Sequence, residues 1–495
     1  MAGIQNRESG IPNILFILSD DQGPWAAGCY GNEEIRTANI DRLAGEGLLF
    51  KNFFCTSPVC SPARASILTG KLPSQHGVHD WIRDGNMPPS AVGYLEGMRS
   101  YSDVLAEKGW VCGLTGKWHL GDSLKPQHGF SSWFCHRKGS GSYVDQPMIR
   151  NGVLEDTKGY VTDVITDEAL KFIESKQGVP FYLSVHYTAP HSPWTGHPEE
   201  IVGSYEECQF LSCPQEARHP WAGPLTRLSH GNREHLKGYF AAVTAMDANI
   251  GRILGKLEQL GLRETTLVIF TSDNGFSCGH HGFWGKGNGT FPINMYENSV
   301  KIPMVVSHPG VIPGGRRTEA MMSQYDLFPT LVDYLGLSQK EKYQGPGSSF
   351  KKVWQGDTDE VREDVVVYDE YGPVRMIRTP EWKYIHRYPF GVHELYNLTR
   401  DPEEKNNRID DSACTSVVQE LRQRLSRWFE RHVDSVRDGS RLPVSGSGQL
   451  FRIDGQRFGE ECFSSDRIAI ENSGFPRVND KVDLEAFQEA ASIKP

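Results

Sequence analysis

The sequence predicts an α/β protein with a large, mainly parallel sheet flanked by helices, and a smaller C-terminal domain of antiparallel sheet plus helix. Three observations lead to this fold class. Continuous apolar runs, typical of strands buried on both faces, alternate with helical patterns over most of the chain. Four of these runs end directly in polar residues. After about residue 355 the pattern changes to short alternating strands followed by one helix.

Four apolar runs predict the central strands of the large sheet. Helical patterns lie between them, and strands that alternate with helices indicate parallel pairing. Ligands of such folds bind beyond the carboxyl ends of the strands, so the polar residues that follow the four runs are the first evidence of an enzyme. The strand-like runs are NILFIL (13–18), VCGLTG (111–116), PFYLSVH (180–186) and TTLVIFTS (265–272), and the helical patterns are at 37–50, 101–110 and 235–261.

The length of 495 residues is too great for one small core. We expect the large domain to span residues 1–355 and the small domain to span 356–435. Residues 436–495 are richer in Gly, Ser and charge and show weak periodicity. We therefore expect this last segment to wrap the protein as irregular structure.

Composition narrows the class of function. The net charge of −10 argues against nucleic acid as a general partner, and no stretch approaches the roughly 20 apolar residues of a membrane span. Residues 1–21 lack the basic start and long apolar core of a signal peptide. The ten cysteines are too dilute for a disulfide scaffold. We expect reduced thiols and a cytoplasmic protein, with a trimmed signal peptide as the lesser alternative; the sequence does not indicate an oligomeric state.

Acidic and amide side chains follow two of the predicted strands. Asp20 and Asp21 come after the first, and Asp273 and Asn274 after the last. Each pair alone is more simply explained as a helix N-cap or a turn. Together, three carboxylates and an amide oxygen at one sheet edge would repel one another unless a cation lay between them. Oxygen ligands of this kind select a hard ion such as Ca²⁺ or Mg²⁺.

Cys60 opens the string CSPAR, at the start of a predicted helix. Ser61 can cap that helix and Pro62 suits its first turn. A disulfide, a zinc ligand, a thiolate nucleophile and a covalently modified residue are all compatible with a cysteine there. A buried, unreactive cysteine would not explain Arg64 one turn later, and a soft thiolate does not suit a hard metal. A thiol that is the precursor of the working group reconciles these residues.

Several other residues have both a structural and a functional reading. Lys117 and His119 can cover the sheet edge, and His191, between two prolines, can stabilise a loop. His280 and His281 have no third ligand at zinc spacing, so contact with a substrate is the better interpretation. Tryptophans are usually packing residues, but three beside one site can stack on a sugar ring, and Arg83 can pair with a substrate carboxylate or a surface aspartate. The three tryptophans are Trp81, Trp194 and Trp284.

The segment CSPARASILTGK (60–71) resembles the signature of the type I sulfatases, within the alkaline phosphatase superfamily. Other segments resemble landmarks of the same family, in the same order, so that the resemblance covers about residues 12 to 410. The last eighty or so residues match no landmark. The further matching segments are NILFILSDDQG, TGKWHLG, APHSPW, FTSDNG, HGFWGKG, SQYDLFPTLVDYLG and ELYNLTRDPEEKNN.

The resemblance implies a role for each motif residue. Cys60 would be converted to formylglycine by a formylglycine-generating or anaerobic sulfatase-maturing enzyme, and its hydrated aldehyde would attack sulfur. Ca²⁺, or Mg²⁺, would be bound by the modified Cys60 together with Asp20, Asp21, Asp273 and Asn274. Three cations would offset the charge of the sulfate, and two histidines would move protons, His191 to the leaving alcohol and His119 from the second hydroxyl. The three cations are Arg64, Lys117 and Lys286, of which Lys286 would also assist His191, and Asp273 would act as a base.

We therefore expect a sulfuric ester hydrolase that acts on a small sulfated carbohydrate. An aryl or choline sulfatase, or a phosphonate monoester or phosphodiester hydrolase of the same superfamily, is the alternative. A non-catalytic calcium-binding relative belongs to a different class, and the complete set of proton-transferring residues argues against it. The substrate binding expected of Trp81, Arg83, Trp194, His280, His281 and Trp284 rests on their nearness to the motifs alone.

Overall fold

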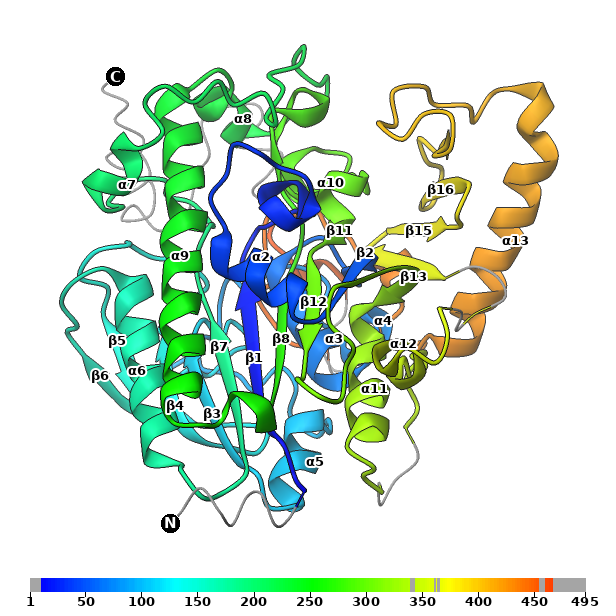
Figure 1. Cartoon of the computed structure of the whole chain (residues 1–495). Helices are drawn as coiled ribbons and strands as arrows, with labels where there is room; N and C mark the ends of the chain where they lie inside the picture. Colours follow the sequence, from blue (N-terminus) through cyan, green and yellow to red (C-terminus); the bar gives the residue numbers. More distant parts are fainter. Residues whose placement is uncertain (1–9, 339–342, 360–361, 363–365, 454–458, 466–495) are drawn as a thin grey trace.

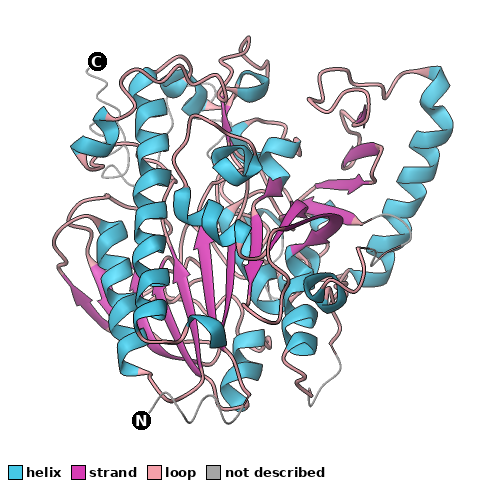
Figure 2. Ribbon diagram, viewed as in Figure 1, coloured by secondary structure: helices cyan, strands magenta, loops and turns pink. Residues whose placement is uncertain are grey.

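Figure 1 shows the chain as a computed structural model, which describes residues 10–338, 343–359, 362, 366–453 and 459–465. The expectations for the N-terminal nine residues and for 466–495 lie outside the described residues. A large sheet runs through the molecule, and helices cover its faces (Figures 1 and 2). Within the described residues no helix is both long enough and apolar enough to cross a membrane.

The large sheet has the order β11-β2-β12-β8-β1-β7-β3-β4-β5-β6, and β13 pairs with β2 off this path. Its centre is parallel, while β11, β12, β5 and β6 join in antiparallel pairs. The strands are β1 (Asn13–Ser19), β2 (Leu48–Phe54), β3 (Val111–Gly116), β4 (Phe130–His136), β5 (Met148–Arg150), β6 (Val153–Glu155), β7 (Phe181–His186), β8 (Thr266–Ser272), β11 (Lys301–Ile302), β12 (Met304–Ser307) and β13 (Arg316–Ser323).

The four strands expected from the sequence are confirmed, and they are consecutive neighbours in the order β8-β1-β7-β3. In register, Ile17 of β1 lies opposite Val185 of β7 on one side and Phe270 of β8 on the other. Every residue of β1, β7 and β8 is buried, which explains why these strands are apolar throughout rather than alternating. Their carboxyl ends therefore meet at one edge of the sheet.

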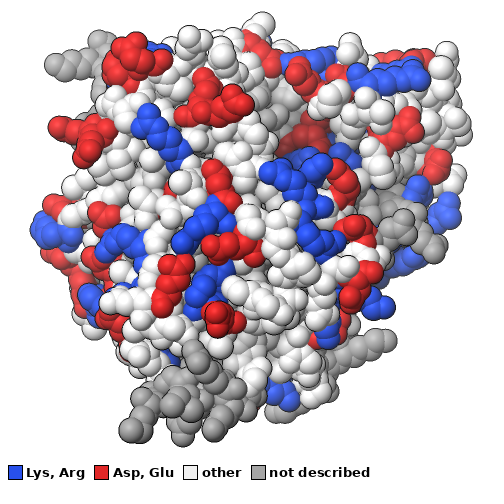
Figure 3. Space-filling view, in the orientation of Figure 1, with Lys and Arg blue, Asp and Glu red and all other residues white. Residues whose placement is uncertain are grey.

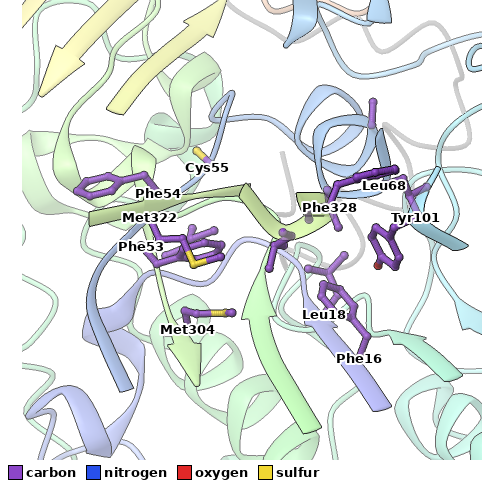
Figure 4. Packing of buried hydrophobic residues seen from close by; sticks show 14 of the residues in the cluster. Phe16, Leu18, Phe53, Phe54, Cys55, Leu68, Tyr101, Met304, Met322 and Phe328 are labelled. Atoms are coloured by element: carbon purple, nitrogen blue, oxygen red, sulfur yellow. The ribbon is translucent and has the colours of Figure 1, made fainter. Parts of the chain in front are cut away.

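Alternate side chains of β1 enter two different cores. Leu15 and Ile17 pack with one cluster, which α9 and α6 cover, whereas Phe16 and Leu18 pack with a second cluster on the opposite face. Figure 4 shows part of that second core, with Phe16, Leu18, Leu68, Tyr101 and Phe328 brought together from strand and helices. The helices that form the two layers are α2 (Ala38–Gly45), α6 (Val161–Ser175) and α9 (Arg233–Gln259) on one side, and α3 (Cys60–Thr69), α5 (Tyr101–Glu107) and α11 (Leu327–Tyr334) on the other.

The pattern at 37–50 is only partly helical. Helix α2 ends at Gly45, and Leu48 already belongs to strand β2. Gly47 allows the change, because a Cβ there would lie 2.2 Å from the carbonyl oxygen of Val306. The remaining short elements are α4 (Pro73–His76), α7 (Glu199–Gly203), α8 (Pro224–Ser229), α10 (Glu297–Val300), α12 (Lys351–Gln355), and the hairpin β9 (Ser277–Cys278) with β10 (Trp284–Gly285).

A separate four-stranded antiparallel sheet forms the smaller unit, with the order β14-β15-β16-β17. Helix α13 packs on it through apolar residues such as Leu421, Leu425 and Phe429. This arrangement agrees with the expected antiparallel sheet plus helix, while the domain boundaries at 355 and 435 stay predictions. The elements are β14 (Val367–Tyr371), β15 (Val374–Arg378), β16 (Trp382–Arg387), β17 (Glu394–Asn397) and α13 (Thr415–His432).

The C-terminal segment returns to the large unit after α13. Its described residues, 436–453 and 459–465, contain only the short 3-10 helices Gly439–Arg441 and Gly459–Cys462 and isolated bridges. One bridge pairs Gln449 with Ile82, so the segment lies beside residues that follow α4. We call residues 446–451 the C-terminal strap.

Charged side chains of both signs are interspersed on the face shown in Figure 3. Arg42 of α2, for example, lies 3.1 Å from Glu258 of α9. All ten cysteines carry free thiols in the structure.

Candidate active site

The polar residues after the four central strands meet at one point, because those strands are neighbours. Asp20 and Asp21 follow β1, and Asp273 follows β8; carboxylate oxygens of all three lie within 4.8 Å of one another. The backbone N–H of Asp21 donates to Asp273 Oδ1 at 3.2 Å. Lys117 after β3 forms an ion pair with Asp20, and His191 after β7 has Nε2 3.8 Å from Asp21 Oδ2.

Asp21, and also His119, which follows β3 and Lys117, have an unusual backbone conformation. Asp21 has φ 66° and His119 has φ 56°, values that residues other than glycine rarely adopt. The Tyr239 hydroxyl donates to the carbonyl oxygen of Asp21 at 2.8 Å and fixes its turn. Gly139 approaches His119 so closely that a Cβ would lie 2.1 Å from its Cε1. The surrounding structure thus fixes both side chains against local preference, as is common at functional sites.

Cys60 is the first residue of α3 and is 2 % exposed. Lys286 Nζ donates to its Sγ at 2.7 Å, and the thiol itself donates to Asp20 Oδ1 at 3.4 Å. Burial, together with the carboxylate of Asp20, raises the pKa of the thiol to about 12. The neutral thiol is therefore the stable form of Cys60 here, and the helix dipole alone does not make it a thiolate.

Ser61 does not cap the helix, contrary to the sequence-based expectation. The N-cap is Val59, which has no side-chain cap bond. Instead the Ser61 hydroxyl donates to the carbonyl oxygen of His119 and accepts from the N–H of Ile82, both at 2.9 Å. Ser61 thus ties the start of α3 to two other parts of the site.

Three cations surround the carboxylates. Arg64 Nε donates to Asp273 Oδ2 at 2.9 Å, and Lys286 Nζ donates to Asp21 Oδ1 at 2.5 Å. Burial alone would raise the pKa of Asp20, but Lys117, followed by His191 and Arg64, outweighs it and holds that pKa well below its usual range. Burial and the nearby Asp20 raise the pKa of Asp273 to about 6, against the opposing Arg64. The cluster is therefore strongly polar inside a dry environment.

The oxygen cluster fits a hard divalent cation. Asn274 Oδ1 is buried and has no hydrogen-bond partner among the described residues, while its Nδ2 donates to Asp21 Oδ1 at 2.7 Å. An orphaned amide oxygen beside three clustered carboxylates is the donor set that Ca²⁺ or Mg²⁺ prefers. The expected ligands Asp20, Asp21, Asp273 and Asn274 are thus brought together, and the identity of the ion stays a prediction.

The two histidines differ in their hydrogen bonds. The Nε2 of His119 lies 2.9 Å from the carbonyl oxygen of Ile82, which only an N–H can satisfy, so Nδ1 is the acceptor of the neutral ring. That Nδ1 has no partner among the described residues. His191 Nδ1 lies 2.6 Å from the carbonyl oxygen of Ser192, which leaves Nε2 on the side of Asp21. Each ring thus has one nitrogen fixed and one available.

A cavity of about 390 Å³ opens above these groups. Cys60, His119, His191 and Lys286 line it, and Trp81 lines it as expected. A second cavity of about 220 Å³ shares His191 and Lys286 with the first. The larger cavity is also lined by Arg83, as expected, and by Lys138, Asn288 and Leu450, which the sequence analysis did not single out.

Four expected substrate-binding residues do not line either cavity. Trp194 and Trp284 pack against each other, with ring centroids 5.1 Å apart, in a buried aromatic cluster. His280 packs against Trp25, and His281 stacks on a tyrosine with ring centroids 3.9 Å apart. These residues support the loop that carries Lys286, and we do not include them in the proposed substrate site.

A buried acidic cluster, ringed by cations, lies at the carboxyl edge of the parallel strands, where enzymes of this fold class bind their ligands. A family model of sulfatases matches residues 12–337, and a model described as N-sulphoglucosamine sulphohydrolase, C-terminal, matches residues 279–431. The chain belongs to the sulfatase family, and it is a sulfuric ester hydrolase.

Relatives named as sulfatases match large parts of the chain. It is 27 % identical to an N-acetylglucosamine-6-O-sulfatase of Bacteroides thetaiotaomicron, over 88 % of this chain and 89 % of the relative. It is 33 % identical to an N-acetylgalactosamine-6-sulfatase of Canis lupus familiaris, over 66 % of this chain and 63 % of that protein. A solved structure of a protein bound to its substrate D-glucosamine-2-N,6-O-disulfate has a TM-score of 0.74 and 26 % identity, and the match covers 85 % of this chain and 98 % of that one.

Proposed function

We propose that this sulfatase hydrolyses the sulfate ester of a small sulfated carbohydrate, with Cys60 converted to formylglycine and a Ca²⁺, or Mg²⁺, ion in the acidic cluster. The observation that carries the proposal is the position of Cys60, which lies at the floor of the cavity within reach of Lys286 and Asp20. Two relatives are named as sulfatases of amino sugars, which supports the carbohydrate class.

The residues of the chain have separable tasks in this proposal. Arg64, Lys117 and Lys286 offset the charge of a bound sulfate ester, because their cationic groups meet in a site that excludes water. Formylglycine at position 60 would supply the nucleophilic hydroxyls once its aldehyde is hydrated, and a divalent cation would polarise a sulfate oxygen. Asp20, Asp21, Asp273 and Asn274 would hold that cation together with the modified Cys60.

Proton transfer falls to the two histidines. His119 Nδ1 is the free acceptor of its ring and takes a proton from a hydroxyl at the position of Cys60. His191 lines the cavity, its Nε2 lies 3.8 Å from Asp21 Oδ2, and it delivers a proton to the leaving oxygen, assisted by Lys286 Nζ. Asp273, whose carboxyl is held by Arg64, is the further base that the resemblance implies.

The size of the larger cavity favours a small substrate. Its volume of about 390 Å³ lies at the lower end of the ~300–1,000 Å³ typical of small-molecule sites. Trp81 gives the cavity an aromatic face, and Arg83 and Lys138 give it cationic groups away from the acidic cluster. A monosaccharide or short oligosaccharide sulfate matches this combination better than a long polymer.

A substrate panel tests the proposal. The enzyme with modified Cys60 is assayed on sugars that carry the sulfate at different ring positions, on aryl and choline sulfates, and on an aryl phosphonate. We expect at least one sulfated sugar to have the highest kcat/KM. Higher values on aryl or choline sulfate than on every sugar would contradict the carbohydrate class, and a preference for the phosphonate would contradict the sulfatase assignment itself.

A further inference from the structure

Strand β7 carries a polar side chain at every second position, although the whole strand is buried. The polar residues are Tyr182, Ser184 and His186, and the apolar Leu183 and Val185 between them pack in the core on the other face. A polar group inside a protein costs free energy unless it has a hydrogen-bond partner. We therefore looked for the partners of these three side chains.

The three side chains form a continuous series of hydrogen bonds that begins at helix α5. The hydroxyls of Tyr101 and Tyr182 lie 2.6 Å apart, and the Tyr182 hydroxyl donates to Ser184 Oγ at 3.0 Å. Ser184 Oγ lies 2.7 Å from His186 Nε2, and His186 Nδ1 lies 2.9 Å from the carbonyl oxygen of Lys117. We call Tyr101, Tyr182, Ser184 and His186 the β7 network.

The last acceptor of the β7 network determines the direction of every bond. A carbonyl oxygen can only accept, so Nδ1 of His186 carries the proton. Burial, together with Arg64, lowers the pKa of His186 to about 3, so the ring is neutral and its Nε2 accepts from the Ser184 hydroxyl. The Tyr182 hydroxyl donates to Ser184 and therefore accepts from Tyr101. All donors of the network thus point toward the active site.

The carbonyl oxygen of Lys117 joins the β7 network to two cations of the active site. It also accepts from Arg64 Nη1 at 2.9 Å, while the N–H of Lys117 donates to the carbonyl oxygen of His186 at 2.8 Å. The Lys117 ammonium pairs with Asp20, and Arg64 Nε donates to Asp273 at 2.9 Å. A displacement of this one carbonyl group would therefore move both cations relative to the acidic cluster.

We propose that His186 is a positioning residue of the active site, which acts through the carbonyl oxygen of Lys117 to hold Arg64 and Lys117 where they bind the sulfate group. The inference rests on the role proposed above for these two cations. His186 lines neither of the two cavities, so it acts on the sulfate only through these residues. The remainder of the β7 network fixes the orientation of its ring.

Two replacements of His186 that branch at the same carbon separate positioning from packing. His186→Asn keeps an N–H donor at the position of Nδ1, whereas His186→Leu places a methyl group there. Both remove Nε2, the acceptor of the Ser184 hydroxyl, so a purely structural role predicts the same effect for both. On the enzyme with modified Cys60 we measure kcat and KM for a small aryl sulfate and the inhibition constant of inorganic sulfate.

We expect His186→Leu to raise KM and the inhibition constant of inorganic sulfate about 3–10-fold, the effect of losing one hydrogen bond, and to change kcat less. His186→Asn should restore both constants to within about twofold of the unchanged enzyme, because the donor to Lys117 is kept. Tyr187→Phe is the matched control. The Tyr187 hydroxyl lies 2.8 Å from Thr166 Oγ1 in the other core, so its loss should leave both constants unchanged.

The inference is overturned if His186→Leu leaves the inhibition constant of sulfate unchanged, or if His186→Asn or Tyr187→Phe raises it as much. If His186→Leu gives no folded protein, His186→Phe, which keeps a ring without a donor, takes its place in the same comparison. Failure of the role proposed for the cations looks different. In that case Lys117→Met leaves inhibition by sulfate unchanged, whatever the variants of His186 do.

Discussion

Replacing Lys383 by methionine should destabilise the protein strongly. Lys383 lies on β16 of the small sheet and is 0 % exposed. Its Nζ lies 2.7 Å from Glu297 Oε1, 2.8 Å from Glu404 Oε1 and 3.0 Å from the carbonyl oxygen of Met295. Because Glu297 begins α10 of the large unit, this ammonium joins the small sheet to the large unit through a buried ion-pair network.

The size of the expected loss of stability follows from the buried carboxylates that remain when methionine replaces Lys383. Removing one partner of a buried ion pair costs about 3–5 kcal/mol, because an uncompensated charge stays buried. Here Glu404 would lose its ammonium partner and face Glu297, which would keep Arg378, with Arg378 Nη2 3.5 Å from Glu297 Oε2. Burial raises the pKa of Glu404 to about 7 in the intact protein, although Lys383 lowers it and Glu297 adds to the increase. Without Lys383 that pKa rises further, and Glu404 takes up a proton at neutral pH.

This protonation gives the loss a defined pH dependence. A carboxyl whose pKa is higher in the folded than in the unfolded chain binds more protons when folded, so stability falls as pH rises between the two values. The deficit of Lys383→Met should therefore be smaller at pH 5 than at pH 8. Urea unfolding followed by tryptophan fluorescence measures it at both values.

Lys51→Met is the matched control. Lys51 also pairs with a glutamate, Glu319 at 2.6 Å, but both side chains are largely exposed, so at most about 1 kcal/mol should be lost. A loss for Lys383→Met as small as that of the control would refute the buried-network reasoning. A deficit that shrinks between pH 5 and pH 8 would refute the proposed titration of Glu404.

Three further predictions concern the site. The peptide that contains Cys60, isolated from the native host, should be about 18 Da lighter than its sequence requires, because a thiol has become an aldehyde; full activity with an entirely unmodified peptide would contradict the proposed nucleophile. Asp21→Asn keeps a residue that tolerates positive φ but removes a charge, so bound metal and activity should fall together while circular dichroism is unchanged; full activity of this variant after chelation would contradict the metal assignment. Trp194→Ala should cost about 3–5 kcal/mol of stability, measured by urea unfolding, because the ring is buried in an aromatic cluster. An unchanged urea midpoint together with lost sugar binding would instead support a role for Trp194 in substrate binding.

The central sheet and its acidic edge could be predicted because local pattern determines them. Strands buried on both faces must be apolar throughout, and parallel neighbours must end at the same edge. Asp20, Asp273 and Lys117 follow their strands directly, so locating the strands also located these residues. The helical pattern at 37–50 shows the limit, because the same apolar residues suit the end of a helix or the start of a strand.

The wall of the cavity could not be predicted in this way. Trp194 follows a motif residue closely, but its orientation depends on packing against Trp284, far along the chain. Leu450 reaches the cavity only because backbone hydrogen bonds join Gln449 to Trp81 and Arg83. Contacts between such distant segments leave no periodic pattern in either one. Ser61 likewise has the composition of a helix cap but makes longer-range bonds instead.

The position of the strap in the sequence also determines when the wall of the active-site cavity is completed during synthesis. Cys60 is made early, and Leu450, which lines the same cavity, is made long after it. At translation rates of about 5–20 residues per second, roughly 20–80 s separate the two. During that interval the cavity lacks the wall that Leu450 contributes, whereas in the complete structure Cys60 is 2 % exposed. The modification that we propose for Cys60 therefore has an open side to the cavity until the strap is made.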